Sequence, residues 1–118
     1  MYINIVIYLV FFSSLAFIFY GVSVLSTDHM GQEFDRYGLS KFRMLTGALE
    51  LLGGIGLCLG ILYKPILSIS SLGLCTLMLL GCGVRVRVRD PWYQLIPAFI
   101  LMIINGYIFS YSLKYSVL

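Results

Sequence analysis

One acidic side chain stands in an apolar stretch, GALELLGGIG at residues 47–56. Glu50 is the single charged residue of that stretch. A charged side chain at the centre of a membrane helix costs about 2.5–3.5 kcal/mol on insertion scales, so such residues usually face protein or a water-filled cavity. Glu50 is therefore the first candidate for a functional residue, and its role depends on which groups lie beside it.

The elements that position Glu50 are predicted from composition and from the length of the apolar blocks. The chain of 118 residues is 60% hydrophobic and 11% charged, whereas soluble proteins average roughly 25% charged residues. Four apolar blocks are each long enough to cross about 30 Å of hydrocarbon as a helix. We predict an all-α fold, a single domain formed by a four-transmembrane-helix bundle, with spans at about 3–25, 44–63, 66–84 and 95–113.

Helical spacing places Glu50 beside small residues in the second predicted span. Arg43 and Glu50 share one helical stripe with two glycines, and three more glycines form a neighbouring stripe. Because lipid contact has no need of glycine, small residues in a membrane helix indicate where another helix approaches closely. Glu50 is thus expected at the edge of a helix-packing face, away from lipid. The predicted packing positions are Gly47, Gly53, Gly54, Gly56 and Gly60.

The first two connections differ in length. The first contains Met30, Phe34 and Tyr37 at i, i+4 and i+7, a spacing that allows a short amphipathic helix lying on the membrane interface. The second is only YKP, in which Pro65 suits the first turn of the next helix. The second and third spans must therefore form an antiparallel hairpin.

The third connection, VRVRVRDPWYQ, is the most basic part of the chain. Its arginines alternate with valines, and in an extended segment this alternation would send every guanidinium to one side. Helix topology places this connection on the same side of the membrane as Glu50. Arginines beside a membrane span commonly pair with lipid headgroups or with carboxylates, so these arginines do not require that the protein binds nucleic acid. The predicted binding pocket consists of Glu50, Arg43, Arg85, Arg87 and Asp90.

Two interpretations of Glu50 remain open at this stage. A carboxylate beside an arginine would stay ionised and would hold the bundle in one geometry. A carboxylate in a dry apolar pocket would instead bind a proton near neutral pH, and would be free to bind a cation or a polar headgroup.

Other reactive residue types are sparse. His29 stands beside Asp28 without further ligands, so no metal site is predicted. Cys58, Cys75 and Cys82 form no CxxC motif and are expected to be small apolar residues within the spans. No serine, histidine and acid grouping is available for nucleophilic catalysis, and no catalytic residue is predicted. Polar residues of the first and fourth spans are expected to form interhelical hydrogen bonds. These are Ser13, Ser14 and Asn105.

Two longer segments resemble the DoxX-like family of small four-span membrane proteins. They are RYGLSKFRMLTGALELLGGIGLCLGIL, leading into the second span, and RVRVRDPWYQLIPAFILMIINGYIF, opening the fourth. The likeness covers most of the chain. The family pattern falls on Gly47, Glu50, Gly53, Arg87, Asp90, Pro97 and Ala98. Many relatives carry a histidine near the end of the third span, where this chain reads GCGVRVR, so chemistry that depends on a histidine is in doubt here.

The resemblance implies a fold more firmly than an activity. Named members include membrane subunits associated with quinone-linked sulfur oxidation, and animal relatives resemble assembly chaperones for other membrane proteins. The resemblance implies a multi-pass protein of the bacterial cytoplasmic membrane. It also implies a possible role as an accessory subunit of a quinone-linked redox system, with a quinone or a lipid as the bound molecule. Six of the eight Lys and Arg residues lie in the two polar loops, which places those loops in the cytoplasm by the positive-inside rule.

Two classes of function follow. The first is a non-catalytic membrane protein that binds a partner membrane protein, a second copy of itself, or a lipid- or quinone-like molecule around Glu50. The alternative is a small proton- or cation-coupled transporter that uses Glu50. Small multidrug transporters also have four spans and one membrane carboxylate, but theirs lies in the first span, and here the first span carries no charge.

Overall fold

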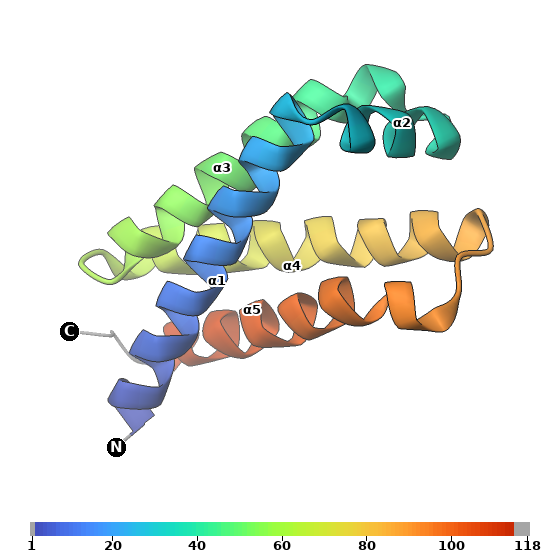
Figure 1. The fold of residues 1–118 in the computed structure, drawn as a ribbon. Coiled ribbons are helices and arrows are strands. Elements are labelled where there is room, and N and C mark those ends of the chain that lie inside the picture. The colour runs from blue at the N-terminus through green and yellow to red at the C-terminus, as the bar shows by residue number, and fades with distance from the viewer. Residues whose placement is uncertain (1, 115–118) are drawn as a thin grey trace.

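The computed structural model of the chain describes the backbone of residues 2–114 and the side chains from Ile5 onward. This part of the chain contains five α-helices and no strand (Figure 1). Four of the helices are long and apolar enough to cross a membrane, so the predicted all-α fold with four spans is confirmed. The helices are α1 (Tyr2–Ser26), α2 (Asp28–Tyr37), α3 (Arg43–Gly60), α4 (Lys64–Arg87) and α5 (Ile96–Lys114), with short 3-10 turns at Ser40–Phe42 and Trp92–Gln94.

The amphipathic helix predicted in the first loop is present as α2. Thr27 caps its first turn, since the Thr27 side chain accepts a hydrogen bond from the Met30 backbone N–H at 3.3 Å. Gly38 ends it at φ 75°, a left-handed conformation that glycine adopts without strain. Phe34 and Tyr37 are buried against the rest of the protein. The apolar side of α2 therefore docks on the bundle.

The basic segment after the third span is mostly helical, so the extended conformation in which its arginines would share one side is not adopted. α4 continues to Arg87. In a helix, the side chains of residues i and i+2 point in directions that differ by about 200°. Arg85 and Arg87 therefore leave the helix in different directions. The helix ends at Arg87, and two residues later Arg89 adopts φ 61°, a left-handed conformation that does not continue a helix. Pro91 also disfavours helical conformation at Asp90, the residue before it. Pro65, as predicted, lies in the first turn of α4.

The spans form two pairs. α1 packs along α3, and α5 packs along α4. α3 and α4 are joined by three residues and diverge from that connection in Figure 1. We call the end with this connection the terminus side, because the start of α1 and the end of α5 lie near it (Figure 1). The end with α2 and the α4–α5 connection is the loop side. Glu50 lies in the loop-side half of α3.

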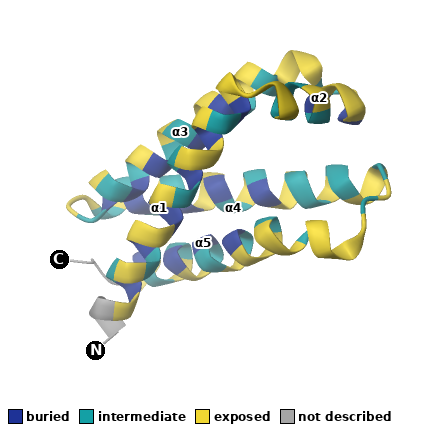
Figure 2. Ribbon diagram, in the orientation of Figure 1, coloured by how far each residue is buried: buried dark blue, intermediate teal, exposed yellow. Residues whose placement is uncertain are grey.

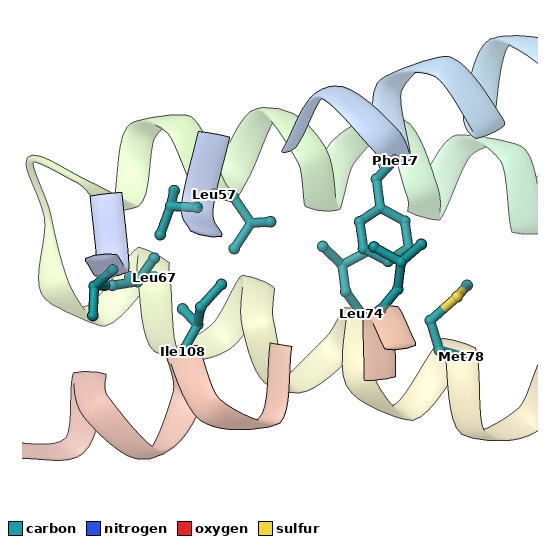
Figure 3. Close-up of a cluster of buried hydrophobic side chains, with 9 residues drawn as sticks. Phe17, Leu57, Leu67, Leu74, Met78 and Ile108 are labelled. Carbon is teal, nitrogen blue, oxygen red and sulfur yellow. The ribbon is translucent and has the colours of Figure 1, made fainter. Parts of the chain in front are cut away.

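The hydrophobic core lies in the middle and the terminus-side half of the bundle (Figure 2). In Figure 3, Phe17 of α1 points toward Leu74 of α4, and Leu57, Leu67 and Ile108 meet nearer the terminus side. The inward stripe of α4 has its last buried residue at Met78, and the first buried residue of α5 is Leu101. Close packing therefore weakens toward the loop side, next to Glu50. The core consists of Val6, Val10, Phe17, Leu57, Leu67, Leu74, Met78, Leu101 and Ile108.

Candidate functional site

Glu50 is enclosed by protein within the second span. Its relative exposure is 6%, so the side chain is not directed at lipid. The Oε2 atom is shielded from solvent and has no hydrogen-bond partner among the residues that the structure describes. A buried polar atom without a partner is rare in folded proteins, because its desolvation is not compensated. This unpartnered oxygen is the feature of the site that needs an explanation.

One glycine stripe brings the Glu50 turn against α1. A methyl group on Gly47 would lie 2.6 Å from the Leu25 side chain, and one on Gly54 would lie 3.0 Å from the Ser14 backbone oxygen. On the α1 side of the same contact, a methyl group on Gly21 would lie 3.0 Å from the Gly47 backbone oxygen. The backbones of α1 and α3 therefore approach closely on this side of Glu50.

The second glycine stripe brings α3 against α4. A methyl group on Gly53 would lie 2.5 Å from the Leu74 side chain, and one on Gly56 would overlap the Ser70 hydroxyl. At Gly60 a methyl group would lie 2.6 Å from the Cα atom of Leu67. Glu50 lies on the edge of the first stripe that is nearer the second, since it follows Gly47 by three residues and precedes Gly53 by three. The carboxyl group thus starts from the face that looks toward both α1 and α4.

Arg43 does not pair with Glu50. Its guanidinium donates to the backbone oxygen of Val24 at 2.6 Å and to that of Thr27 at 2.7 Å. Both acceptors belong to the last turn of α1 and the residue after it. Because the last carbonyls of a helix have no partner within that helix, a guanidinium is well suited to bind them. Arg43 therefore ties the start of α3 to the end of α1, and the pair considered from sequence is not formed.

Arg85 and Asp90 belong to a cluster that also includes two residues of α2. Asp90 Oδ1 accepts a hydrogen bond from Arg36 Nη1 at 2.7 Å, and Asp90 Oδ2 accepts one from Arg85 Nη1 at 3.0 Å. Glu33 Oε2 lies 2.8 Å from Arg36 Nη2 and 3.9 Å from Arg85 Nη1. We call Glu33, Arg36, Arg85 and Asp90 the loop-side ion network. It connects α2 to the end of α4 and to the α4–α5 connection.

The charges of this network are mutually stabilised. The hydrogen bond from Arg36 lowers the pKa of Asp90 below its ordinary value, and it lowers the pKa of Glu33 as well. Tyr37 packs within the same cluster, where its hydroxyl donates to Glu33 at 3.1 Å and its ring lies under Arg36. Burial raises the pKa of Tyr37. At neutral pH both carboxylates are therefore ionised.

Arg87 makes a separate contact between the same elements. Its Nη2 atom donates to the backbone oxygen of Tyr37, near the end of α2. The structure thus divides the five predicted pocket residues among three places. Arg85, Arg87 and Asp90 hold the loop side together, Arg43 joins α1 to α3, and Glu50 lies deeper with none of these groups bound to it in the described part of the chain.

Glu33 and Arg36 were not predicted as site residues. Their spacing of i and i+3 on an amphipathic segment is a recognisable signal for an ion pair. What sequence cannot supply is the distance from α2 to Asp90, because it depends on how α2 folds back over the end of α4. The predicted interhelical hydrogen bonds are present. Ser14 Oγ donates to the Gly54 oxygen at 2.7 Å, and Asn105 Nδ2 donates to Ser13 Oγ at 2.8 Å.

An apolar layer separates Glu50 from the terminus side. Phe17, Leu57 and Ile108 have no exposed surface and belong to one hydrophobic cluster. Asn105 lies within this region, and its Oδ1 atom is a second buried oxygen without a partner among the described residues. Buried hydroxyl groups also lie in this part of the bundle, those of Ser13, Ser14, Ser71 and Ser112.

A groove of about 350 Å³ runs between α3 and α4 on the outer surface. Leu49, Gly53, Ser70 and Gly73 are among its lining residues, whereas Glu50 is not. Its lining is apolar apart from Ser70, so acyl chains can fill it in a bilayer. The polar site and this groove are consequently distinct.

Within residues 2–114 no three His, Cys, Asp or Glu side chains lie close enough together to hold a metal ion. Cys58, Cys75 and Cys82 are free thiols, and the Cys58 sulfur lies 2.9 Å from Ser14 Oγ. These thiols are half-buried within the spans. The arrangement offers binding and hydrogen bonding around Glu50, and it offers ion pairing at the loop side.

Comparison with known proteins gives a family. The model of the DoxX-like family matches residues 5–106, which is most of the chain. No curated protein and no solved structure matches the chain significantly. The match includes α1 from residue 5, α2 to α4, Glu50, the glycine stripes, the loop-side ion network and the first part of α5. The chain therefore belongs to the DoxX-like family of membrane proteins.

Proposed function

We propose that this protein binds a lipid-like molecule in the membrane through the Glu50 carboxyl group, without carrying out covalent chemistry. A single observation supports the proposal above others. Glu50 is buried at 6% exposure and its Oε2 atom has no partner in the described chain. A bound molecule that donates a hydrogen bond to Oε2 would remove the cost of that unpaired oxygen. A quinol or another hydroxylated lipid has the required chemistry.

The arginines that were candidates to pair with Glu50 support this assignment, because other groups already bind them. Arg43 is bound to backbone oxygens, and Arg85 is bound to Asp90. Neither is available to neutralise Glu50 without losing these contacts. In this proposal the loop-side ion network and Arg43 hold the helix ends around the site, while Glu50 alone contacts the ligand's polar group.

Transport of protons or cations is less well supported. Conduction requires polar groups or water across the whole bilayer. Phe17 and Ile108 are fully buried between Glu50 and the terminus side, and they would have to separate for an ion to pass. Proteoliposomes with a pH gradient are expected to show the same proton leak with wild type and with Glu50→Gln.

The proposal is tested by identifying what copurifies. Wild type, Glu50→Gln and Asp35→Asn are extracted directly from membranes into polymer-bounded discs, and their lipids are analysed by mass spectrometry. Asp35→Asn is the matched control, because it converts an exposed carboxylate of α2 to an amide. We expect one amphiphile to be enriched over bulk lipid in wild type and in Asp35→Asn, and to be lost in Glu50→Gln. Equal enrichment in all three would refute the proposal, and enrichment of a protein in place of a lipid would point to a partner membrane protein.

A further inference from the structure

Apolar packing joins the two helix pairs over only part of their length. Near the α3–α4 connection, Gly60 lies against Leu67. In the middle of the bundle, Phe17 of α1 points toward Leu74 of α4 (Figure 3). Toward the loop side, the last buried residue of α4 is Met78. The apolar contacts between the pairs therefore lie at the terminus side and in the middle of the bundle.

α2 belongs to the α1–α3 pair. It follows α1 after a single residue. Arg43, at the start of α3, donates to the backbone oxygens of Val24 and Thr27 at the end of α1. The same guanidinium lies against α2, because a methyl group on Gly31 would be 2.7 Å from it. We call α1, α2 and α3 the first arm of the molecule, and α4 and α5 the second arm.

Polar contacts join the two arms on the loop side. Arg36 of the first arm lies 2.7 Å from Asp90 of the second, measured from Nη1 to Oδ1. Glu33 of the first arm lies 3.9 Å from Arg85 of the second, measured from Oε2 to Nη1. Arg87 of the second arm donates to a backbone oxygen near the end of α2. These contacts are made by side chains at the ends of α2 and α4, where the arms diverge (Figure 1). Contacts of this kind can break while a packed core stays intact.

Glu50 lies next to the part of the molecule where the arms separate. Gly53, three residues from Glu50 toward the terminus side, lies against Leu74 of the second arm. Glu50 itself lies on the loop side of that contact, and it starts from the face of α3 that looks toward α4. A separation of the arms that begins at the loop side would therefore reach Glu50 before it disturbs the contact between Gly53 and Leu74.

We infer that the loop-side ion network is a latch that controls access from the membrane to Glu50. While Arg36 and Asp90 are paired, the arms are held together at both ends and Glu50 is enclosed. When the pair breaks, the arms separate on the loop side and stay joined at the terminus side, and a lipid-soluble molecule enters between α3 and α4. The purpose of this opening rests on the proposed function, since access matters only if Glu50 binds a ligand. The opening itself does not depend on a ligand.

Distances between spin labels test whether the arms separate. Labels are introduced as an unnatural amino acid at Met44 of α3 and Val86 of α4, two exposed positions on the loop side. Neither position belongs to α2, so undocking of α2 alone does not change this distance. A second pair of labels, at Tyr8 of α1 and Leu113 of α5, reports the terminus side. Both pairs are measured by pulsed electron paramagnetic resonance in discs of synthetic phosphatidylcholine.

Two substitutions break the latch from opposite arms. In Asp90→Asn we expect the population with a longer distance between Met44 and Val86 to increase at least about tenfold, as for loss of a hydrogen bond between charged groups. Arg36→Gln is expected to give the same result, and it serves if Asp90→Asn does not fold. Asp35→Asn and Arg89→Gln are the matched controls, because they change an exposed acid and an exposed arginine outside the network. The terminus-side distance should stay as in wild type throughout.

A lipid-soluble carboxyl reagent tests whether the opening leads to Glu50. Dicyclohexylcarbodiimide is added to the same discs, and modification of Glu50 is followed by mass spectrometry of its peptide. We expect Glu50 to react several-fold faster in Asp90→Asn than in wild type or Asp35→Asn. Glu50→Gln gives the background of the measurement.

An unchanged distance between Met44 and Val86 in both network variants would overturn the inference. Equal lengthening at both label pairs would also overturn it, since that result reports a general loosening of the bundle. Separation of the arms without faster modification of Glu50 would show that the opening does not lead to the carboxyl group, and the latch would then have no role in access. None of these measurements involves a natural ligand, so failure of the proposed function is recognised separately, by the absence of an enriched lipid in the copurification experiment.

Discussion

Arg36 and Asp90 are 54 positions apart in the chain, yet Nη1 of Arg36 lies 2.7 Å from Oδ1 of Asp90. The Asp90 side chain is only 6% exposed. The contact joins α2 to the connection between α4 and α5 at the end where core packing is weakest. Ion pairs and hydrogen bonds therefore replace apolar packing as the link between the two helix pairs on the loop side.

We predict that Asp90→Asn loosens α2 without unfolding the spans. The substitution removes the charge that pairs with both Arg36 and Arg85. Hydrogen exchange of the α2 amides should accelerate several-fold, while exchange in the core segments of α1 and α4 stays unchanged. Asp35→Asn, which alters an exposed acid on the same helix, is the control. Equal exchange in α2 for Asp90→Asn and wild type would show that the network does not hold this helix.

The same network gives a pH dependence with a defined sign. Arg36 lowers the pKa of Asp90 and of Glu33. A carboxyl whose pKa is lowered by folding stabilises the folded state above its ordinary pKa, about 4, and loses that contribution as the pH falls through the lowered value. Exchange of the α2 amides, corrected for intrinsic rates, should be constant between pH 6 and 8, roughly, and should rise only in acid. A rise between neutral pH and pH 6 would contradict this assignment.

Glu50→Gln is predicted to leave stability nearly unchanged. Glu50 has no ion pair or hydrogen bond to lose within residues 5–114, and glutamine has nearly the same shape. In discs of synthetic phosphatidylcholine the free energy of unfolding should change by less than about 1 kcal/mol. A much larger destabilisation would indicate that Glu50 holds the bundle together through a charge, as the alternative from sequence supposed.

Glycines at two positions of the hairpin are predicted to respond in opposite ways to the same change. Gly60→Ala places a methyl group 2.6 Å from the Leu67 Cα atom, so the helices must separate, at a cost of about 1–3 kcal/mol. Gly73→Ala meets nothing within 4 Å and should be neutral or slightly stabilising, because alanine favours helix. Thermal unfolding in the same lipid compares the two. Similar melting temperatures would contradict the close approach at Gly60.

The hydrogen bond between Asn105 and Ser13 is predicted to contribute about 1 kcal/mol, as such bonds do between membrane helices. Its length is 2.8 Å and both residues are fully buried. A double-mutant cycle with Asn105→Ala and Ser13→Ala measures the coupling. Additive losses from the two substitutions would mean that the pair does not interact.

The parts that could be predicted from sequence depend on local or one-dimensional signals. Apolar block length predicts the four helices, and Pro65 marks the start of α4. Stripe spacing finds the glycines around Glu50, because residues on one helix face are fixed by the helical period. The partners of Arg43, Arg85 and Arg87 could not be predicted in this way. Those partners depend on how α2 folds back over α4. The alternation of arginine with valine would place the guanidiniums on one side only in an extended segment, whereas α4 continues to Arg87.

The central claim, that the Glu50 carboxyl group contacts a bound molecule in the membrane, is tested most directly by carbon-13 NMR of its carboxyl carbon. The chain has only two glutamates, Glu33 and Glu50, so labelling gives two signals, and Glu50→Gln identifies them. We predict that the Glu50 signal moves when protein in native-membrane discs is transferred to pure synthetic phosphatidylcholine, while the Glu33 signal stays in place. A Glu50 signal that is the same in both lipids would contradict the account.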